Sequence, residues 1–133
     1  MTALPDARQR DLVKYEDMRL HAERARRFLG SRSLGDFLAD ELVQSAVVRC
    51  VEVIGEAARL VSEETRRRAP GIPGKPIVGM RHILAHDYGV VNLDKVHDVV
   101  TRHMPPLITE LKPLIAALEH DVGWSDESGS AGN

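Results

Sequence analysis

The stretch Glu41–Ala69 reads ELVQSAVVRCVEVIGEAARLVSEETRRRA and decides the fold. Apolar residues recur in it at steps of three and four, which is the spacing of one face of an α-helix. They are Val43, Ala46, Val47, Cys50, Val53, Ile54, Ala57, Leu60 and Val61. This stripe lasts for more than two heptads, so it requires helical partners on the same chain, on a second subunit, or on both. We therefore predict one long helix over residues 41–69.

A second helix is predicted over Ala7–Leu29, where apolar residues again recur at helical steps and Gly30 is a suitable stop. Its inward residues would be Leu12, Tyr15, Ala22, Ala25 and Phe28 or Leu29. Four arginines, Arg24, Arg26, Arg27 and Arg32, crowd the end of this helix. Cations there suit the negative pole of the helix dipole, so a solvated helix end is the simpler explanation. A patch that contacts phosphates is the alternative.

Turn residues and prolines divide the rest of the chain. Residues 33–38 read as a linker with one helical turn and Phe37 turned inward, and the Pro70–Pro76 segment breaks the helical pattern. Pro76 and Gly89 would bracket a helix, as proline at the start and glycine past the end commonly do. Asn92 can cap a helix over 93–103, which Pro105–Pro106 would end or kink. Leucines then predict a last helix over 107–118, in spite of Pro113.

The predicted fold is all-α, an up-and-down bundle of four to five helices in one domain. The domain would occupy residues 1–120. Residues 121–133 are rich in glycine, serine and acidic residues and predict a flexible tail. With only 4% aromatic residues, the core must be mostly aliphatic.

Composition limits the function in three ways. The net charge of −2 does not suit a protein that coats nucleic acid in bulk, so any RNA contact would depend on local arginine clusters. Cys50 is the single cysteine, so no intrachain disulfide is possible and a reducing compartment fits. The chain shows no signal peptide and no apolar run near the roughly 20 residues of a membrane span. We expect a cytoplasmic protein with no membrane contact.

The segment Gly79–Gly89, GMRHILAHDYG, concentrates the reactive side chains of the chain: Arg81, His82, His86 and Tyr88. RNA can be cut without metal when the ribose 2′-hydroxyl is the nucleophile. That reaction needs a base, an acid and a fixed cation at the phosphate. Histidine suits the first two roles because its pKa lies near neutrality. Arginine suits the third because it is always charged and can donate twice to one phosphate.

On an ideal helix Arg81 and His86 point about 140° apart, which disfavours a site within one chain. A cleft between two copies removes this difficulty. His82 and His86 are also spaced like a helical metal-ligand pair. A third ligand would have to come from Asp87, His97, His103 or a second subunit, and we expect neither a metal nor a cofactor. His97 and His103 read as ordinary surface histidines.

The sequence Arg81-x4-His86-x-Tyr88 resembles the signature of the HepT-like toxins of the HEPN superfamily. The resemblance extends to the segment Glu52–Ala58 and covers roughly Leu12 to Leu118. It implies an HEPN-like helical fold and a homodimeric, metal-independent ribonuclease that cuts tRNA or mRNA. It also implies a toxin partnered by a nucleotidyltransferase antitoxin.

The resemblance assigns roles to four residues. Arg81 and His86 would be catalytic, His82 would support them, and Tyr88 would accept AMP from the antitoxin. His82 stands where the family more often has Asn, and Gly74 stands where an aromatic residue is common. The alternative is a helical subunit of a nucleotidyltransferase that binds RNA or nucleotide without cutting it, since binding and cutting a phosphodiester need the same residue types.

Overall fold

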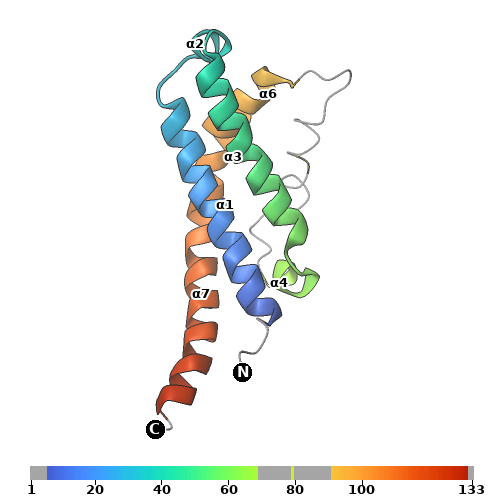
Figure 1. Ribbon diagram of the computed structural model, residues 1–133, viewed down its shortest axis with the longest axis vertical. Coiled ribbons are helices and arrows are strands. Elements are labelled where there is room, and N and C mark those ends of the chain that lie inside the picture. The colour runs from blue at the N-terminus through green and yellow to red at the C-terminus, as the bar shows by residue number, and fades with distance from the viewer. Residues whose placement is uncertain (1–5, 69–78, 80–90, 132–133) are drawn as a thin grey trace.

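Three long helices form the body of the molecule in the computed structural model, which describes residues 6–68, 79 and 91–131, with side chains as far as Asp121. They are α1 (Ala7–Leu29), α3 (Glu41–Leu60) and α7 (Met104–Ala131). Helix α1 packs against both of the others, and α3 and α7 each run antiparallel to it (Figure 1). The described residues contain no strand. The prediction of an all-α helical bundle is therefore confirmed.

Helix α1 has the predicted bounds because both of its ends are capped. The Asp6 carboxylate accepts a hydrogen bond of 2.9 Å from the Gln9 backbone N–H, and the Gln9 side chain accepts one from the Asp6 N–H. This reciprocal pair satisfies donors that an open helix start would leave free. At the other end Gly30 has a φ of 59°, a conformation that glycine adopts without a steric penalty. The chain therefore turns sharply after Leu29.

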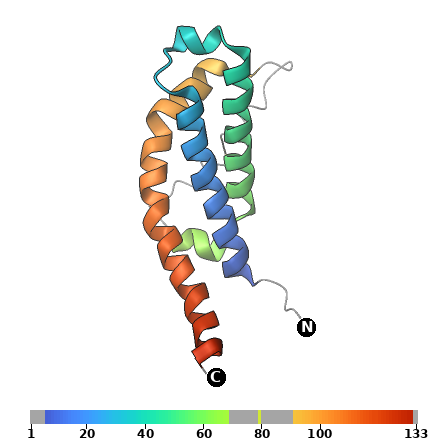
Figure 2. The same cartoon turned by 60° about the vertical axis from the view of Figure 1, so that its left-hand side comes forward.

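The linker after α1 contains the predicted helical turn, α2 (Leu34–Leu38), which Ser33 caps. Phe37 is fully buried, as predicted, and its ring lies 5.8 Å from that of His97 on α6 (Leu93–Asp98). Figures 1 and 2 show α2 across the end of the bundle where α1 stops and α3 begins. Phe37 thus closes that end of the core.

The prediction of one helix over 41–69 is wrong at Val61. Helix α3 ends at Leu60, Val61 is extended with a ψ of 140°, and a short helix, α4 (Glu63–Arg67), follows. The cause is Ser62, whose hydroxyl accepts a hydrogen bond from the Thr65 backbone N–H and starts the new helix. The apolar spacing continues through Val61, but the Ser62 cap ends one helix and starts the next.

The C-terminal helices follow one another without an interruption. Helix α6 passes into a π-helical turn, η2 (Val99–His103), and this passes into α7. The Met104 N–H bonds to the Val99 carbonyl, which gives the wider turn. Pro105 and Pro106 lie directly after this turn and have no N–H to donate to the preceding carbonyl oxygens. The chain nevertheless stays helical through them, and the irregularity is the π-helical turn just before them.

Helix α7 contains Pro113, and the last helix predicted over 107–118 is confirmed. It continues through residues 121–131, which were predicted as a tail. The domain boundary at residue 120 and the flexibility of the tail stay predictions.

The core is aliphatic, as the composition predicts. Its largest fully buried side chains come from every long helix: Met18, Leu29, Phe37, Val47, Val51, Ile54, Val96, Val100, Met104, Leu111 and Leu118. Two side chains from the predicted apolar stripes are exposed. Phe28, one of two candidates for an inward position, is 36% exposed, and Leu60 is 46% exposed. Their neighbours Leu29 and Val61 are buried in their place.

Candidate functional site

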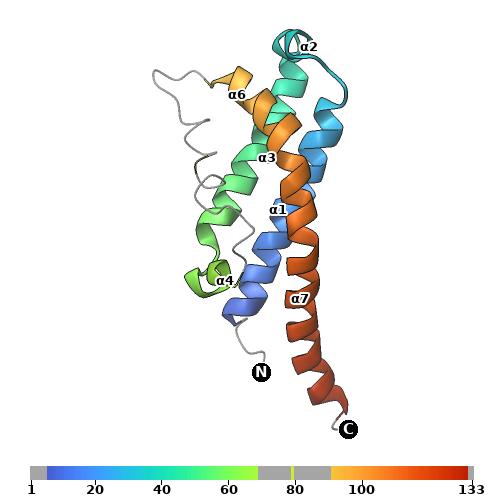
Figure 3. The same ribbon diagram turned by 180° about the vertical axis from the view of Figure 1, so that it is seen from behind.

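The four predicted site residues, Arg81, His82, His86 and Tyr88, lie outside the described residues. Gly74 and Asp87 lie outside them as well. The structure does describe the elements that flank this stretch in the sequence, α4 before it and α6 after it. These two helices lie at opposite ends of the bundle (Figures 1 and 3).

The flank before the motif is fixed by a buried polar cluster made of Asp11, Ser62 and Thr65. One oxygen of the Asp11 carboxylate accepts a hydrogen bond of 2.9 Å from the Ser62 backbone N–H. The other accepts from the hydroxyls of Ser62 and Thr65. Asp11 and Thr65 are each only 3% exposed. A buried carboxylate is tolerated when its lone pairs are satisfied in this way, so the cluster ties the start of α4 to α1.

Two arginines of the Arg66–Arg68 run extend this attachment. Arg66 donates to the carbonyl oxygens of Ala58 and Arg59, at 2.7 and 3.1 Å, and so satisfies the open end of α3. Arg68 pairs with Asp121 of α7 at 3.0 Å. Arg66 and Arg68 thus connect α4 to α3 and α7.

The flank after the motif is fixed by α6. The Asn92 side chain accepts a hydrogen bond of 3.1 Å from the Lys95 N–H, so the predicted cap is confirmed, and Val91 packs against the core. His97 was predicted as a surface histidine, but it is half-buried. Its Nε2 lies 3.1 Å from the Arg32 carbonyl oxygen, besides the contact with Phe37. His103 is exposed, as predicted.

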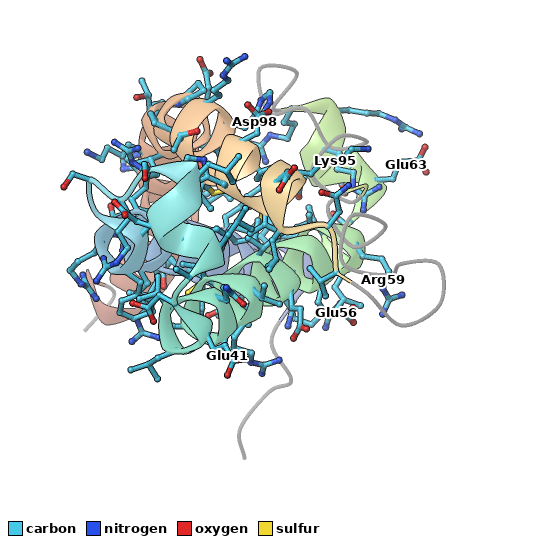
Figure 4. All side chains as sticks on the ribbon, turned by 90° about the horizontal axis from the view of Figure 1, so that it is seen from above. Glu41, Glu56, Arg59, Glu63, Lys95 and Asp98 are labelled. Carbon is cyan, nitrogen blue, oxygen red and sulfur yellow. The ribbon has the colours of Figure 1, made fainter. Side chains whose placement is uncertain are left out.

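The Glu52–Ala58 segment, which carries part of the family resemblance, lies on α3. One side of it is buried and the other faces outward. Ile54, Gly55, Ala57 and Ala58 are buried in the core. Glu56 faces outward, where its carboxylate accepts from Arg59 at 2.7 Å. In Figure 4 the side chains of Glu56 and Arg59 project to the same side of the molecule as Glu63 and Lys95. This side of α3 is charged.

Burial in the core raises the pKa of two side chains, Tyr15 and Cys50. Burial raises the pKa of Tyr15 to about 12, with the Asp11 carboxylate adding to the rise and Arg66 opposing it. Burial also raises the pKa of the Cys50 thiol, against the opposing charges of Arg24, Arg27 and Arg49. Cys50 is buried, as predicted, and its raised pKa suits an unreactive thiol.

The described part of the chain offers no group of three His, Cys, Asp or Glu side chains placed to hold a metal ion. Within the same residues, no helix has the length and hydropathy to cross a bilayer.

The sequence model of the family described as "Ribonuclease HepT-like" matches residues 18–114. The chain belongs to this family. The match runs from α1 into α7 and includes the positions of Arg81, His86 and Tyr88. The resemblance found in the sequence is thereby confirmed at the level of the family.

Named relatives of this HepT-like chain agree with that assignment. The protein named "Putative RNase MJ1216" of Methanocaldococcus jannaschii is 30% identical over 109 residues, which cover 82% of this chain and 85% of the relative. "Putative RNase MJ0127" of the same organism is 33% identical over 92 residues, 69% of this chain and 76% of its own. "Probable ribonuclease HepT" of Thermococcus cleftensis is 36% identical over 72 residues, which cover 54% of this chain and 66% of the relative. No solved structure matches this HepT-like chain significantly.

Asp11 was not among the residues that the sequence predicted to matter. It shares the buried face of α1 with Tyr15, Met18 and Ala22, so an acid at a core position of the helical pattern was the available signal.

Proposed function

We propose that this HepT-like protein is an RNA endonuclease that works without a metal ion. The observation that carries the proposal is the family match over residues 18–114. The matched range includes the sequence Arg81-x4-His86-x-Tyr88, which resembles the family's signature. The relatives named as RNases support the same activity.

In the proposed reaction a base removes the proton of the ribose 2′-hydroxyl, and the 2′-oxygen attacks the adjacent phosphorus. The bond from phosphorus to the 5′-oxygen breaks, and an acid protonates that oxygen. The products are a 2′,3′-cyclic phosphate and a free 5′-hydroxyl. His86 carries out proton transfer, Arg81 holds the charge that develops on the phosphate oxygens, and His82 supports them.

The proposed unit is a homodimer, because Arg81 and His86 diverge on an ideal helix and a cleft between two copies can bring one of each to the same phosphate. The bundle supports such pairing through exposed apolar side chains: Val13, Leu20, Leu34, Leu38, Leu42 and Leu60. Size-exclusion chromatography with light scattering tests the pairing. The protein should elute with twice the chain mass of 14.7 kDa. A monomer at micromolar concentration with full activity would contradict it.

We further propose that the protein is the toxin of a type VII toxin–antitoxin pair and acts in the cytoplasm on tRNA or mRNA. Its partner would be a nucleotidyltransferase that moves AMP from ATP to the Tyr88 hydroxyl and releases pyrophosphate. The added phosphate would compete with RNA for Arg81 and obstruct the site. Incubation with the cognate transferase and ATP should add the mass of one AMP, and Tyr88→Phe should abolish the gain. An unchanged mass of the Tyr88 protein would overturn this part of the proposal.

The activity is tested with purified protein and RNA in EDTA, beside the His86→Ala variant. The wild type should cut the RNA and the variant should leave it intact. Intact RNA in both reactions would favour the alternative, a binding subunit of a nucleotidyltransferase. Cutting in both would place the reaction on other residues.

A further inference from the structure

The last turns of α1 carry three arginines, Arg24, Arg26 and Arg27, and none of them forms an ion pair with a carboxylate in the described residues. Other arginines of the bundle do form such pairs, among them Arg19 with Glu23, Arg59 with Glu56 and Arg102 with Asp98. Arginines without a carboxylate partner keep their donors available for an external anion.

The fourth arginine of the cluster has a different role. Arg32 donates from Nη1 to the carbonyl oxygens of Phe28 and Leu29, each at 3.0 Å, and its Nε lies 3.9 Å from Asp40. It closes the end of α1, as the helix-end explanation predicts. Among the described residues, the cluster therefore divides into a capping residue, Arg32, and three arginines with no ion pair to a described carboxylate.

Within α1, Arg24 and Arg27 are three residues apart and therefore occupy neighbouring positions on one side of the helix. Helix α3 packs against α1 and carries Arg49, which is widely exposed and lies 3.4 Å from Glu52. The positive charges of Arg24, Arg27 and Arg49 also oppose the rise in the pKa of the Cys50 thiol. Arg49 therefore adds positive charge from the helix that packs against α1.

An aromatic ring stands beside these charges. Phe28 is 36% exposed, and the Arg27 guanidinium lies 5.5 Å from the centre of its ring. An exposed phenyl ring next to unpaired arginines is suited to single-stranded nucleic acid, since the ring can stack on a base while the guanidinium groups bind phosphates.

We propose that Arg24, Arg27 and Phe28 form a contact surface for single-stranded RNA that holds the substrate strand during cutting. The surface rests on the proposed function for its choice of RNA as the ligand. Arg24 and Arg27 bind backbone phosphates, Phe28 stacks on a base, and Arg49 adds positive charge from α3.

The test is the binding of a fluorescein-labelled 20-nucleotide single-stranded RNA, followed by anisotropy in EDTA. All proteins carry His86→Ala so that the RNA stays intact. Arg24→Gln/Arg27→Gln is compared with Arg102→Gln/Lys112→Gln, which removes the same two charges from other exposed positions. The Arg24/Arg27 variant should bind more weakly. Its slope of log affinity against log salt should fall by about 1.4, since each phosphate contact in a single strand contributes about 0.7. The control should keep the parental slope.

A second variant separates stacking from charge. Phe28→Leu should weaken the binding of single-stranded RNA by about fivefold or more, which corresponds to about 1 kcal/mol of lost stacking. It should leave the slope of log affinity against log salt unchanged. It should not change binding to a duplex of the same sequence, in which the bases are already stacked. Circular dichroism and thermal melting confirm that each variant is folded.

Equal binding by the Arg24/Arg27 variant and its control would overturn the proposal, as would a Phe28→Leu protein that binds as tightly as its parent. Loss of binding to polyglutamate together with unchanged RNA binding would assign the surface to an acidic protein and would also overturn it. Failure of the ribonuclease proposal gives a different result, namely intact RNA in EDTA with the native His86 protein. The binding assay does not depend on that outcome.

Discussion

Asp11, in the second turn of α1, accepts hydrogen bonds from both the backbone N–H and the hydroxyl of Ser62, 51 residues later in the sequence. This pair holds the start of α4 against α1, immediately before the stretch that carries the motif. Asp11 is almost fully buried, so its carboxylate is the acceptor inside the protein for the Ser62 N–H and for the Ser62 and Thr65 hydroxyls.

Asp11→Ala should destabilise the protein by about 3 kcal/mol, because the Ser62 N–H and the Ser62 and Thr65 hydroxyls lose their acceptor inside the protein. Urea unfolding followed by circular dichroism measures the change. Asp17→Ala, in the same helix and less buried, is the control and should change stability by no more than about 0.5 kcal/mol. Equal effects of the two substitutions would show that the Asp11 cluster is not structural.

Phe37→Ala should cost about 3–5 kcal/mol, because it removes a fully buried ring at the end of the bundle and leaves a cavity beside His97. Leu42→Ala, at a position that is 81% exposed, should change stability by about 0.5 kcal/mol or less. Thermal unfolding of the two variants under identical conditions compares them. A mild effect of Phe37→Ala would mean that α2 is not part of the core.

Tyr15 gives a prediction for alkaline pH. The chain has two tyrosines, so Tyr88→Phe leaves Tyr15 as the single phenol that titrates. Absorbance at 295 nm should report a pKa of about 12 in the folded protein and about 10 in urea. Since the folded pKa is raised, the unfolded chain loses its proton first. Stability should therefore fall as pH rises from about 10 toward 12. A folded-state pKa near 10 would show that the ring is not buried.

Glu16 gives a prediction near neutral pH. Burial, followed by a hydrogen bond and charge repulsion from Glu119 on α7, raises the pKa of the Glu16 carboxyl. Because the pKa is raised in the folded protein, the folded state binds the Glu16 proton more tightly than the unfolded chain does. The stability that this proton contributes is lost as pH rises through the folded pKa. Glu16→Gln should raise the melting temperature at pH 7, and the gain should shrink as the pH falls toward 4. Glu110→Gln, an exposed acid of α7, should show no such trend.

The same pair can be checked by combining substitutions. Because Glu16 and Glu119 repel one another, Glu119→Gln should give a similar gain, and the double variant should gain less than the sum of the two. Additive effects would mean that the two carboxyls do not interact.

Much of the fold was predictable because local chemistry and apolar spacing agree. Ala7–Leu29 is bounded by Asp6 and Gly30, and both caps can be read from the sequence. Asn92 and the inward position of Phe37 were recognised for the same reason. The family could be recognised because the Arg81-x4-His86-x-Tyr88 sequence and the Glu52–Ala58 segment both resemble it, and the match over residues 18–114 confirms the family.

The errors arose where a tertiary contact overrides the local pattern. The apolar spacing of α3 continues through Val61, but Asp11 holds Ser62 from a distant part of the chain and allows a new helix to begin there. Pro105 and Pro106 suggested an end or a kink, but the chain stays helical through them and the π-helical turn η2 lies directly before them. His97 was predicted to lie on the surface because its contacts with Phe37 and Arg32 are long-range and leave no pattern in its own helix. The roles of Arg81, His82, His86 and Tyr88 stay predictions, since those residues lie outside the part of the chain that the structure describes.

In the proposed reaction the ribose 2′-hydroxyl, and not a metal-activated water, is the nucleophile. The most direct measurement gives the purified protein two RNAs of one sequence in EDTA, one native and one with 2′-O-methyl riboses throughout. We predict that the native RNA is cut to fragments ending in 2′,3′-cyclic phosphate, and that the methylated RNA stays intact. Cutting of the methylated RNA, or cutting of the native RNA only after magnesium is restored, would contradict the claim.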